Sequence, residues 1–243
     1  MHMLPNLDIK KILFLDIETV PLYPDFGSVP EEEQLYFTEK TAYQRKEEVS
    51  PEDFYSRAGI WAEFGKIICI SVGYFASSSA PRDFRLRSFY GEEKGLLLEY
   101  KALLDTFFNT ARHRMCGHNA KEFDFPFIAR RMLIHQIQLP KMLLLFDKKP
   151  WEVPHIDTMH LWRFGDFKHY TSLKLMAHVL QIPSPKEDID GSQVADVYYK
   201  ENDLERIVAY CERDVVTVAQ LFLRLRIESL LDENEISFSQ LKK

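Results

Sequence analysis

The sequence contains few cysteines and no stretch that could cross a membrane. Its three cysteines, Cys69, Cys116 and Cys211, are scattered without a CxxC pair, which predicts buried free thiols in a reducing compartment. No apolar run approaches the roughly 20 residues that a membrane helix needs, and residues 1–10 lack the charged-then-apolar pattern of a signal peptide. We therefore expect a cytoplasmic protein with no membrane partner.

An excess of positive charge is also missing. The 31 Lys and Arg against 37 Asp and Glu give a formal net charge of -6. This balance argues against a protein that coats long stretches of nucleic acid by neutralising phosphates. It leaves room for a local basic groove, and several acids gathered in a metal site would contribute to the total.

Length and composition are those of an ordinary globular protein. The 243 residues are 46% hydrophobic and 28% charged, enough for one sizeable core. We expect residues 1–243 to form a single domain with a charged helical insertion at about 31–62, solvated and able to flank a site. Two domains are the alternative.

The N-terminal apolar run carries the first candidate site. Residues 12–15 are all apolar, which predicts a short strand in the middle of a sheet, and Asp16 and Glu18 follow at its end. Because strand side chains alternate between faces, both acids point to the same side. They would raise each other's pKa unless a cation shares the site, and hard oxygen ligands suit Mg²⁺ or Mn²⁺. The alternative is a strand end that leaves two acids in water.

Apolar periodicity predicts the remaining elements. Strands are expected at 66–75, 84–90 and 114–117, with a short strand or helix entry at 155–158. Helices are expected at 92–109, from about 124 to 131, at 170–180, at 191–200 with a cap at Ser192, and from about 202 to 225. Within the helix at 170–180, Leu173, Leu175, Met176 and Val179 would form the apolar face.

Two further acidic positions occur later in the chain. Asp124 would begin a helix, where the helix dipole favours a carboxylate, so a purely capping role is the alternative to a metal ligand. Tyr210 and Asp214 are four residues apart on the last helix and share one face. A core tyrosine above a salt-bridged aspartate is the alternative there. His118 beside Gly117 is more typical of a hydrogen-bonded loop residue than of a ligand.

Together these segments resemble a known family. Asp16-x-Glu18-Thr19, Asn119-x-x-x-Phe123-Asp124 and Tyr210-x-x-x-Asp214 resemble, in this order, the three motifs of the DEDD superfamily of 3′–5′ exonucleases. The resemblance runs from about residue 11 to 225 and is closest to stand-alone relatives of the proofreading domain of family B DNA polymerases. One subtype has a histidine five residues before the last aspartate and the other a tyrosine four before it. Ala209 and Tyr210 occupy these positions, so the chain resembles the tyrosine type, DEDDy.

The resemblance implies a fold and a set of functional residues. The fold would be α/β and ribonuclease H-like, with a mixed central sheet of about five strands flanked by helices. Two Mg²⁺ or Mn²⁺ ions would be held by Asp16, Glu18, Asp124 and Asp214. Tyr210 would orient the attacking water, because a phenol with a pKa near 10 is a poor base at neutral pH. The residues expected to bind substrate are Thr19, Asn119, Phe123 and Lys174, with an exposed helix lysine as the alternative for Lys174.

The implied activity is removal of nucleoside 5′-monophosphates from the 3′ end of a nucleic acid, with single-stranded DNA favoured. An RNA 3′-exonuclease of the same mechanism is one alternative, since no residue indicates a contact with a 2′-hydroxyl. A non-catalytic nucleic-acid-binding or adaptor module that keeps the fold is the other. The sequence indicates no particular protein partner.

Overall fold

The computed structural model describes residues 4–45, 49–166, 168, 170–183 and 189–238. A six-stranded mixed sheet in the order β5-β4-β1-β2-β3-β6 forms the centre of the molecule. Its strands are β1 (Ile12–Pro21), β2 (Gly65–Ser77), β3 (Asp83–Tyr90), β4 (Arg114–Gly117), β5 (Ile156–Asp157) and β6 (Ile236–Phe238). β1 pairs antiparallel with β2 and parallel with β4, and β2 pairs antiparallel with β3. The predicted ribonuclease H-like α/β fold is thereby confirmed.

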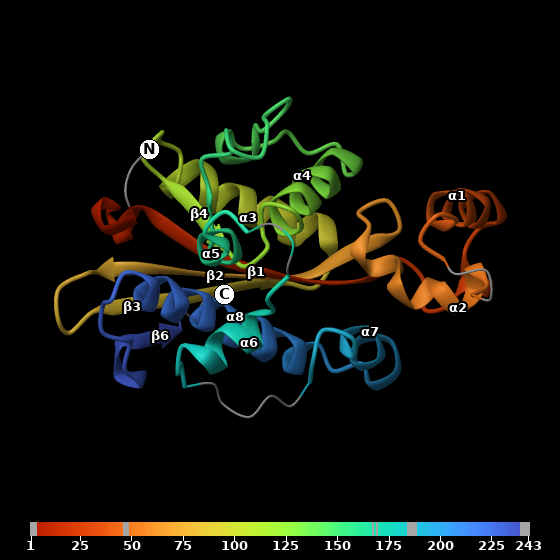
Figure 1. The fold of residues 1–243 in the computed structure, drawn as a ribbon. Coiled ribbons are helices and arrows are strands. Elements are labelled where there is room, and N and C mark those ends of the chain that lie inside the picture. Colours follow the sequence, from red (N-terminus) through yellow and green to blue (C-terminus); the bar gives the residue numbers. More distant parts are fainter. Residues whose placement is uncertain (1–3, 46–48, 167, 169, 184–188, 239–243) are drawn as a thin grey trace.

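Helices cover both faces of this sheet (Figure 1). α3 (Glu93–Phe107) and α4 (Asp124–Ile134) lie on one face, and α6 (Leu173–Val179) and α8 (Leu204–Leu225) on the other. Alternation along β1 explains this arrangement. Leu13 and Leu15 pack in the core cluster of α3 and α4, whereas Phe14 packs against Phe222 of α8 with ring centroids 5.5 Å apart.

A buried ion pair fixes α4 against its neighbours. Arg131 of α4 donates through Nε to Glu93 Oε1 of α3 at 2.9 Å, and through Nη1 to the carbonyl of Ala62 at 2.8 Å. Glu93 also accepts the backbone N–H of Ile67 in β2 at 2.6 Å. Because this network joins α3, α4 and β2, it holds the C-terminal end of α4 against its neighbours.

The remaining helical segments are short, apart from the 11-residue α1. They are η1 (Leu4–Asn6), η2 (Ile9–Lys11), η3 (Phe26–Ser28), α1 (Glu31–Thr41), α2 (Pro51–Phe54), η4 (Tyr55–Ile60), η5 (Lys141–Leu143), α5 (Thr158–Arg163), α7 (Val194–Asp196), η6 (Val197–Glu201) and η7 (Glu233–Glu235). Among the described residues, no helix is both long and apolar enough to cross a membrane.

Some sequence predictions need correction. The helix expected at 191–200 is a single α-turn followed by the π-turn η6, and Ser192 does not cap it, because its backbone N–H and hydroxyl both donate to Asp190. On α6, Met176 is buried, but Leu175 and Val179 are about half exposed. β6 was not predicted, because a long-range ion pair between Arg82 and Glu235 (2.9 Å) holds the segment that leads into it.

The insertion is more ordered than its charge pattern suggested. α1, α2 and η4 form a lobe beyond the ends of β1 and β2 (Figure 1). Phe37 is fully buried at its centre, and its ring lies 5.2 to 6.1 Å from those of Phe26, Tyr55, Trp61 and Phe64. The expected solvated excursion therefore has an aromatic core of its own.

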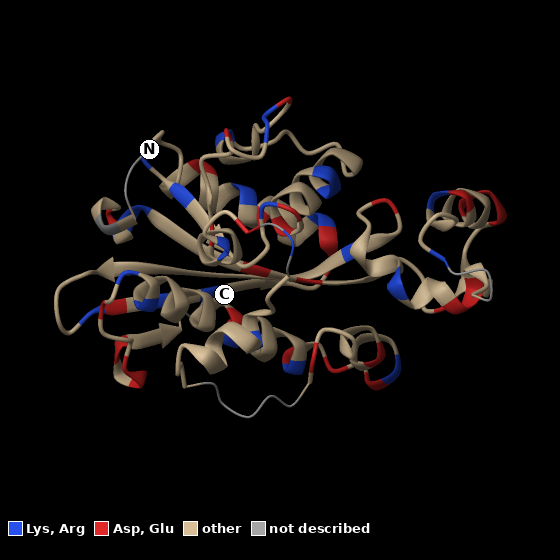
Figure 2. Ribbon diagram, viewed as in Figure 1, with Lys and Arg blue, Asp and Glu red and all other residues tan. Residues whose placement is uncertain are grey.

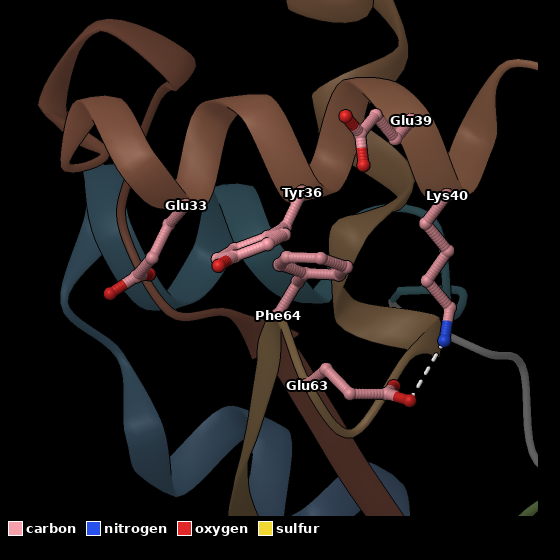
Figure 3. A pocket seen from close by; sticks show the side chains of 6 residues that line it. All are labelled: Glu33, Tyr36, Glu39, Lys40, Glu63 and Phe64. Atoms are coloured by element: carbon pink, nitrogen blue, oxygen red, sulfur yellow. Dashed lines mark hydrogen bonds and ion pairs between the residues drawn. The ribbon is translucent and has the colours of Figure 1, made fainter.

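A hollow of about 650 Å³ lies against α1 in this lobe (Figure 3). It is lined by Glu33, Tyr36, Glu39, Lys40, Glu63 and Phe64. The single lysine is 2.7 Å from Glu63, so two glutamates remain to repel a phosphate. This surface is therefore poorly suited to a nucleic-acid backbone.

Candidate active site

β1 places two acids side by side near the middle of the sheet. Asp16 and Glu18 each offer an oxygen atom that lies within 4.8 Å of the other and of the Cys211 thiol. Burial is the main reason that both carboxyl pKa values lie well above their usual range, and Asp214 and Asp124 raise them further. Because their pKa values are raised, these carboxyl groups retain a proton more readily than free ones when no cation is bound.

Asp124 reaches the same site from the first turn of α4. The pairing of β1 with β4 ends at Phe14. Beyond it, the Asp124 carboxylate accepts hydrogen bonds from the backbone N–H groups of Ile17 and of Asp124 itself. Burial outweighs these bonds and raises the pKa of Asp124 to about 8, with a further contribution from Asp157. Asp124 thus lies at a helix N-terminus, as the capping alternative required, and also faces the acids of β1.

α8 brings the third segment. Its first turn is capped by Asp203, which accepts the N–H of Arg206. One helical turn separates Tyr210 from Asp214, and the Tyr210 hydroxyl is hydrogen-bonded to the Asp214 carboxylate. Burial and the nearby acids raise the pKa of Tyr210 far above its usual value of 10. The phenol therefore keeps its proton and acts as a hydrogen-bond donor.

Sequence reasoning missed the contact that Cys211 makes. All three cysteines are free and buried, as predicted, but the Cys211 thiol also lies 3.5 Å from the Asp16 carbonyl and 3.6 Å from Asp16 Oδ2. Burial raises the thiol pKa well above its usual value, so the sulfur is a neutral donor to Asp16 rather than a thiolate ligand. The sequence signal that could have indicated this contact was the position of Cys211 directly after Tyr210.

The donor set fits a hard divalent cation. Burial and neighbouring acids raise the pKa values of Asp16 and Glu18, and burial raises that of Asp124, a cost that a positive ion in their midst would remove. Their ligand atoms are carboxylate oxygens, which Mg²⁺ and Mn²⁺ prefer over sulfur or nitrogen. In Figure 2, acidic and basic residues are interspersed over both helical layers.

The predicted substrate residues differ in their surroundings. The Thr19 hydroxyl donates to the carbonyl of Gly59 at 2.8 Å, which ties β1 to the insertion. Asn119 adopts a left-handed conformation with φ of 61°, and its buried Oδ1 has no hydrogen-bond partner among the described residues. The Phe123 ring lies 5.4 Å from that of Phe127.

Lys174 lies on α6, and His118 directly follows β4 and bonds to residues near α5 and α6. Lys174 is exposed on α6, and its charge adds to the hydrogen bonds from Ser192 that lower the pKa of Asp190. His118 bonds through Nε2 to the Thr171 carbonyl (2.8 Å) and through Nδ1 to the Thr158 hydroxyl (2.9 Å). His118 is therefore the hydrogen-bonded loop residue that the sequence predicted.

Comparison with known proteins agrees with this geometry. Residues 60–240 match the family described as a predicted 3′–5′ exonuclease related to the exonuclease domain of PolB. The matched segment contains Asp124, Tyr210 and Asp214, whereas Asp16 and Glu18 precede it. No curated protein matches the chain. Because the match spans more than half of the sequence, the chain belongs to this family of predicted 3′–5′ exonucleases related to the PolB exonuclease domain.

Proposed function

We propose that the protein is a metal-dependent 3′–5′ exonuclease that releases nucleoside 5′-monophosphates from single-stranded DNA. The observation that carries this proposal is the cluster of Asp16, Glu18, Asp124 and Asp214. These acids come from three separate segments, yet each of the other three raises the pKa of Asp16. Such a cluster is unfavourable by itself and becomes favourable with divalent ions between the carboxylates.

The acids divide the ligand duties between two Mg²⁺ or Mn²⁺ ions. Asp16 would contribute to both, Glu18 and Asp214 to the ion that carries the attacking water, and Asp124 to the other. When bound, the two ions activate water and neutralise the charge that develops on the phosphate. The Cys211 S–H group donates to Oδ2 of Asp16 and so helps to hold this carboxylate in position.

Tyr210 has a positioning role in this scheme. Its hydroxyl stays protonated and already donates to Asp214, so it orients the water near that carboxylate and does not remove a proton from it. Asn119 Oδ1 is a free acceptor for the 3′-terminal nucleotide. Phe123 offers a ring beside Asp124 for contact with the base, and Lys174 a charge for a phosphate. The contribution of Thr19 is to hold the insertion against the site through Gly59.

The test is a comparison of labelled DNA and RNA oligonucleotides of one sequence, each with Mg²⁺ or Mn²⁺, with the released products identified. We expect mononucleotides released stepwise from the 3′ end, faster from DNA. Asp124→Asn should abolish the release. Asp105→Asn is the matched control, because Asp105 is an exposed acid on α3 that pairs only with Lys101 among the described residues.

The possible results separate the candidate functions. Faster release from RNA would support the exonuclease activity and show that RNA, not DNA, is the preferred substrate. Binding of either oligonucleotide without any release, under both metals, would refute the enzyme and favour a binding module.

A further inference from the structure

Asp157 ends β5 and collects an unusual number of backbone hydrogen bonds. Its side chain is 2% exposed. Oδ1 accepts the N–H groups of Asn119 (3.0 Å), Met159 (3.0 Å) and His160 (3.2 Å), and Oδ2 accepts that of Lys121 (3.0 Å). One carboxylate thus receives four N–H groups from two separate segments of the chain.

These bonds serve two different purposes. Those from Met159 and His160 cap the N-terminus of α5, a common role for an aspartate. Those from Asn119 and Lys121 fasten the turn that leads from β4 to Asp124. Because both oxygens face backbone N–H groups, the side chain is arranged to hold this turn and not to bind a metal ion.

The turn has a conformation that needs such support. Asn119 has φ of 61°, a left-handed conformation that asparagine adopts more readily than most residues other than glycine but that still favours a fixed turn. The Asn119 Oδ1 atom is buried and has no hydrogen-bond partner in the part of the chain that the structure describes. A buried acceptor without a partner carries a desolvation cost, which a donor on a bound ligand would remove.

We propose that Asp157 is a positioning residue for the substrate. By holding the backbone of Asn119 and Lys121, it keeps Asn119 Oδ1 where this atom accepts a hydrogen bond from the 3′-terminal nucleotide, whose 3′-hydroxyl is a donor of the required kind. This inference rests on the proposed exonuclease function and adds to it a residue that touches neither metal nor substrate.

Serine separates this role from simple helix capping. Ser, Asn and Asp are about equally good N-cap residues. Asp157→Ser therefore keeps an acceptor for α5 but lacks the second oxygen that faces Lys121. Asp157→Asn is the milder variant, because it retains Oδ1 and places an amide group against the Lys121 N–H. If Asp157 only caps α5, both variants should behave like the wild type.

The experiment uses the full chain and three measurements. A 5′-labelled single-stranded DNA is bound in Ca²⁺ to obtain Kd, its hydrolysis in Mg²⁺ gives KM and kcat, and hydrogen exchange is followed at residues 119–121. For Asp157→Ser we expect Kd and KM to rise by up to about tenfold, the upper range for one neutral hydrogen bond, and exchange at 119–121 to accelerate. The Mn²⁺ concentration for half-maximal rate should stay unchanged.

Asp25→Ser is the matched control, because Asp25 caps the η3 turn that precedes the insertion. It should leave all three measurements as in the wild type. A folded Asp157→Ser protein with unchanged Kd, KM and exchange would overturn the inference. So would the unfolding of both Asp157 variants, because Asp157 would then be needed for the fold as a whole.

Failure of the proposed function looks different. A wild type that binds DNA without hydrolysing it would refute the exonuclease, while Kd and hydrogen exchange would still decide the role of Asp157. A wild type that binds neither DNA nor RNA would remove both proposals.

Discussion

Removal of the Tyr210 hydroxyl should lower turnover without emptying the metal site. Tyr210→Phe keeps the ring on α8 and deletes only the group that donates to Asp214. A hydrogen bond to a charged group contributes about 1.5–3 kcal/mol, and 1.4 kcal/mol corresponds to about tenfold in rate. If the hydroxyl orients the attacking water, kcat should fall about tenfold to hundredfold, with KM nearly unchanged because the contact matters in the transition state.

The assay is steady-state release of mononucleotides as a function of Mn²⁺ concentration, compared with Asp214→Asn. That variant loses a proposed ligand, so excess Mn²⁺ should partly restore its rate, whereas Tyr210→Phe should not respond. Tyr199→Phe is the matched control. The Tyr199 hydroxyl donates to the carbonyls of Pro21 (2.6 Å) and Leu22 (3.1 Å), so its loss should lower the melting temperature and leave kcat intact.

Full turnover by Tyr210→Phe on both DNA and RNA would refute the reasoning. Tyr210 would then be a core tyrosine whose hydroxyl serves only to satisfy Asp214. A fall in rate that excess Mn²⁺ reverses would also count against it, because the hydroxyl would then act on metal affinity.

The remaining predictions concern charge in the same site. Asp16→Asn should abolish release, and its melting temperature in a chelator should equal or exceed that of the wild type, because repulsion with Glu18 is relieved; a lowered melting temperature with normal activity would make Asp16 structural. Chelation should stop the reaction and Mg²⁺ or Mn²⁺ restore it, with little turnover in Ca²⁺, whose looser coordination misplaces the water; activity that survives exhaustive chelation would exclude the two-metal scheme. The Asp124 pKa of about 8 against an ordinary 3.8 means that its contribution to stability is present below pH 3.8 and is lost as pH rises through 8. Stabilisation by Mg²⁺ in thermal melts should therefore be larger at pH 8 than at pH 5, and equal stabilisation at both would contradict a site that includes Asp124.

Local periodicity explains why much of this fold could be predicted from the sequence. The apolar run before Asp16 is buried on both sides, and a two-residue spacing places Asp16 and Glu18 together. The four-residue spacing of Tyr210 and Asp214 likewise determined their contact on α8. Such relations depend only on the geometry of one strand or one helix.

Features that depend on distant segments were not predictable in this way. Phe37 lies among charged residues in the sequence, and its burial arises from aromatic rings brought together from residues 26 to 64. β6 follows from the pairing of Glu235 with Arg82, which is 153 residues away. Neither the burial of Phe37 nor the contact of Glu235 with Arg82 has a periodic signal in the sequence, because both depend on how whole elements pack together.

Asp157 shows why a residue's type and position in an element do not reveal all that its side chain does. In sequence it is an acid before a short helix, the pattern of an ordinary N-cap, and the cap is indeed present. The two additional N–H groups come from residues 119 and 121, which β4 brings beside β5. Asp16 and Asp157 are both aspartates on strands of the same sheet, yet one faces carboxyl groups and the other faces backbone N–H groups. That difference in surroundings is what makes the first suited to a cation and the second suited to hold the chain.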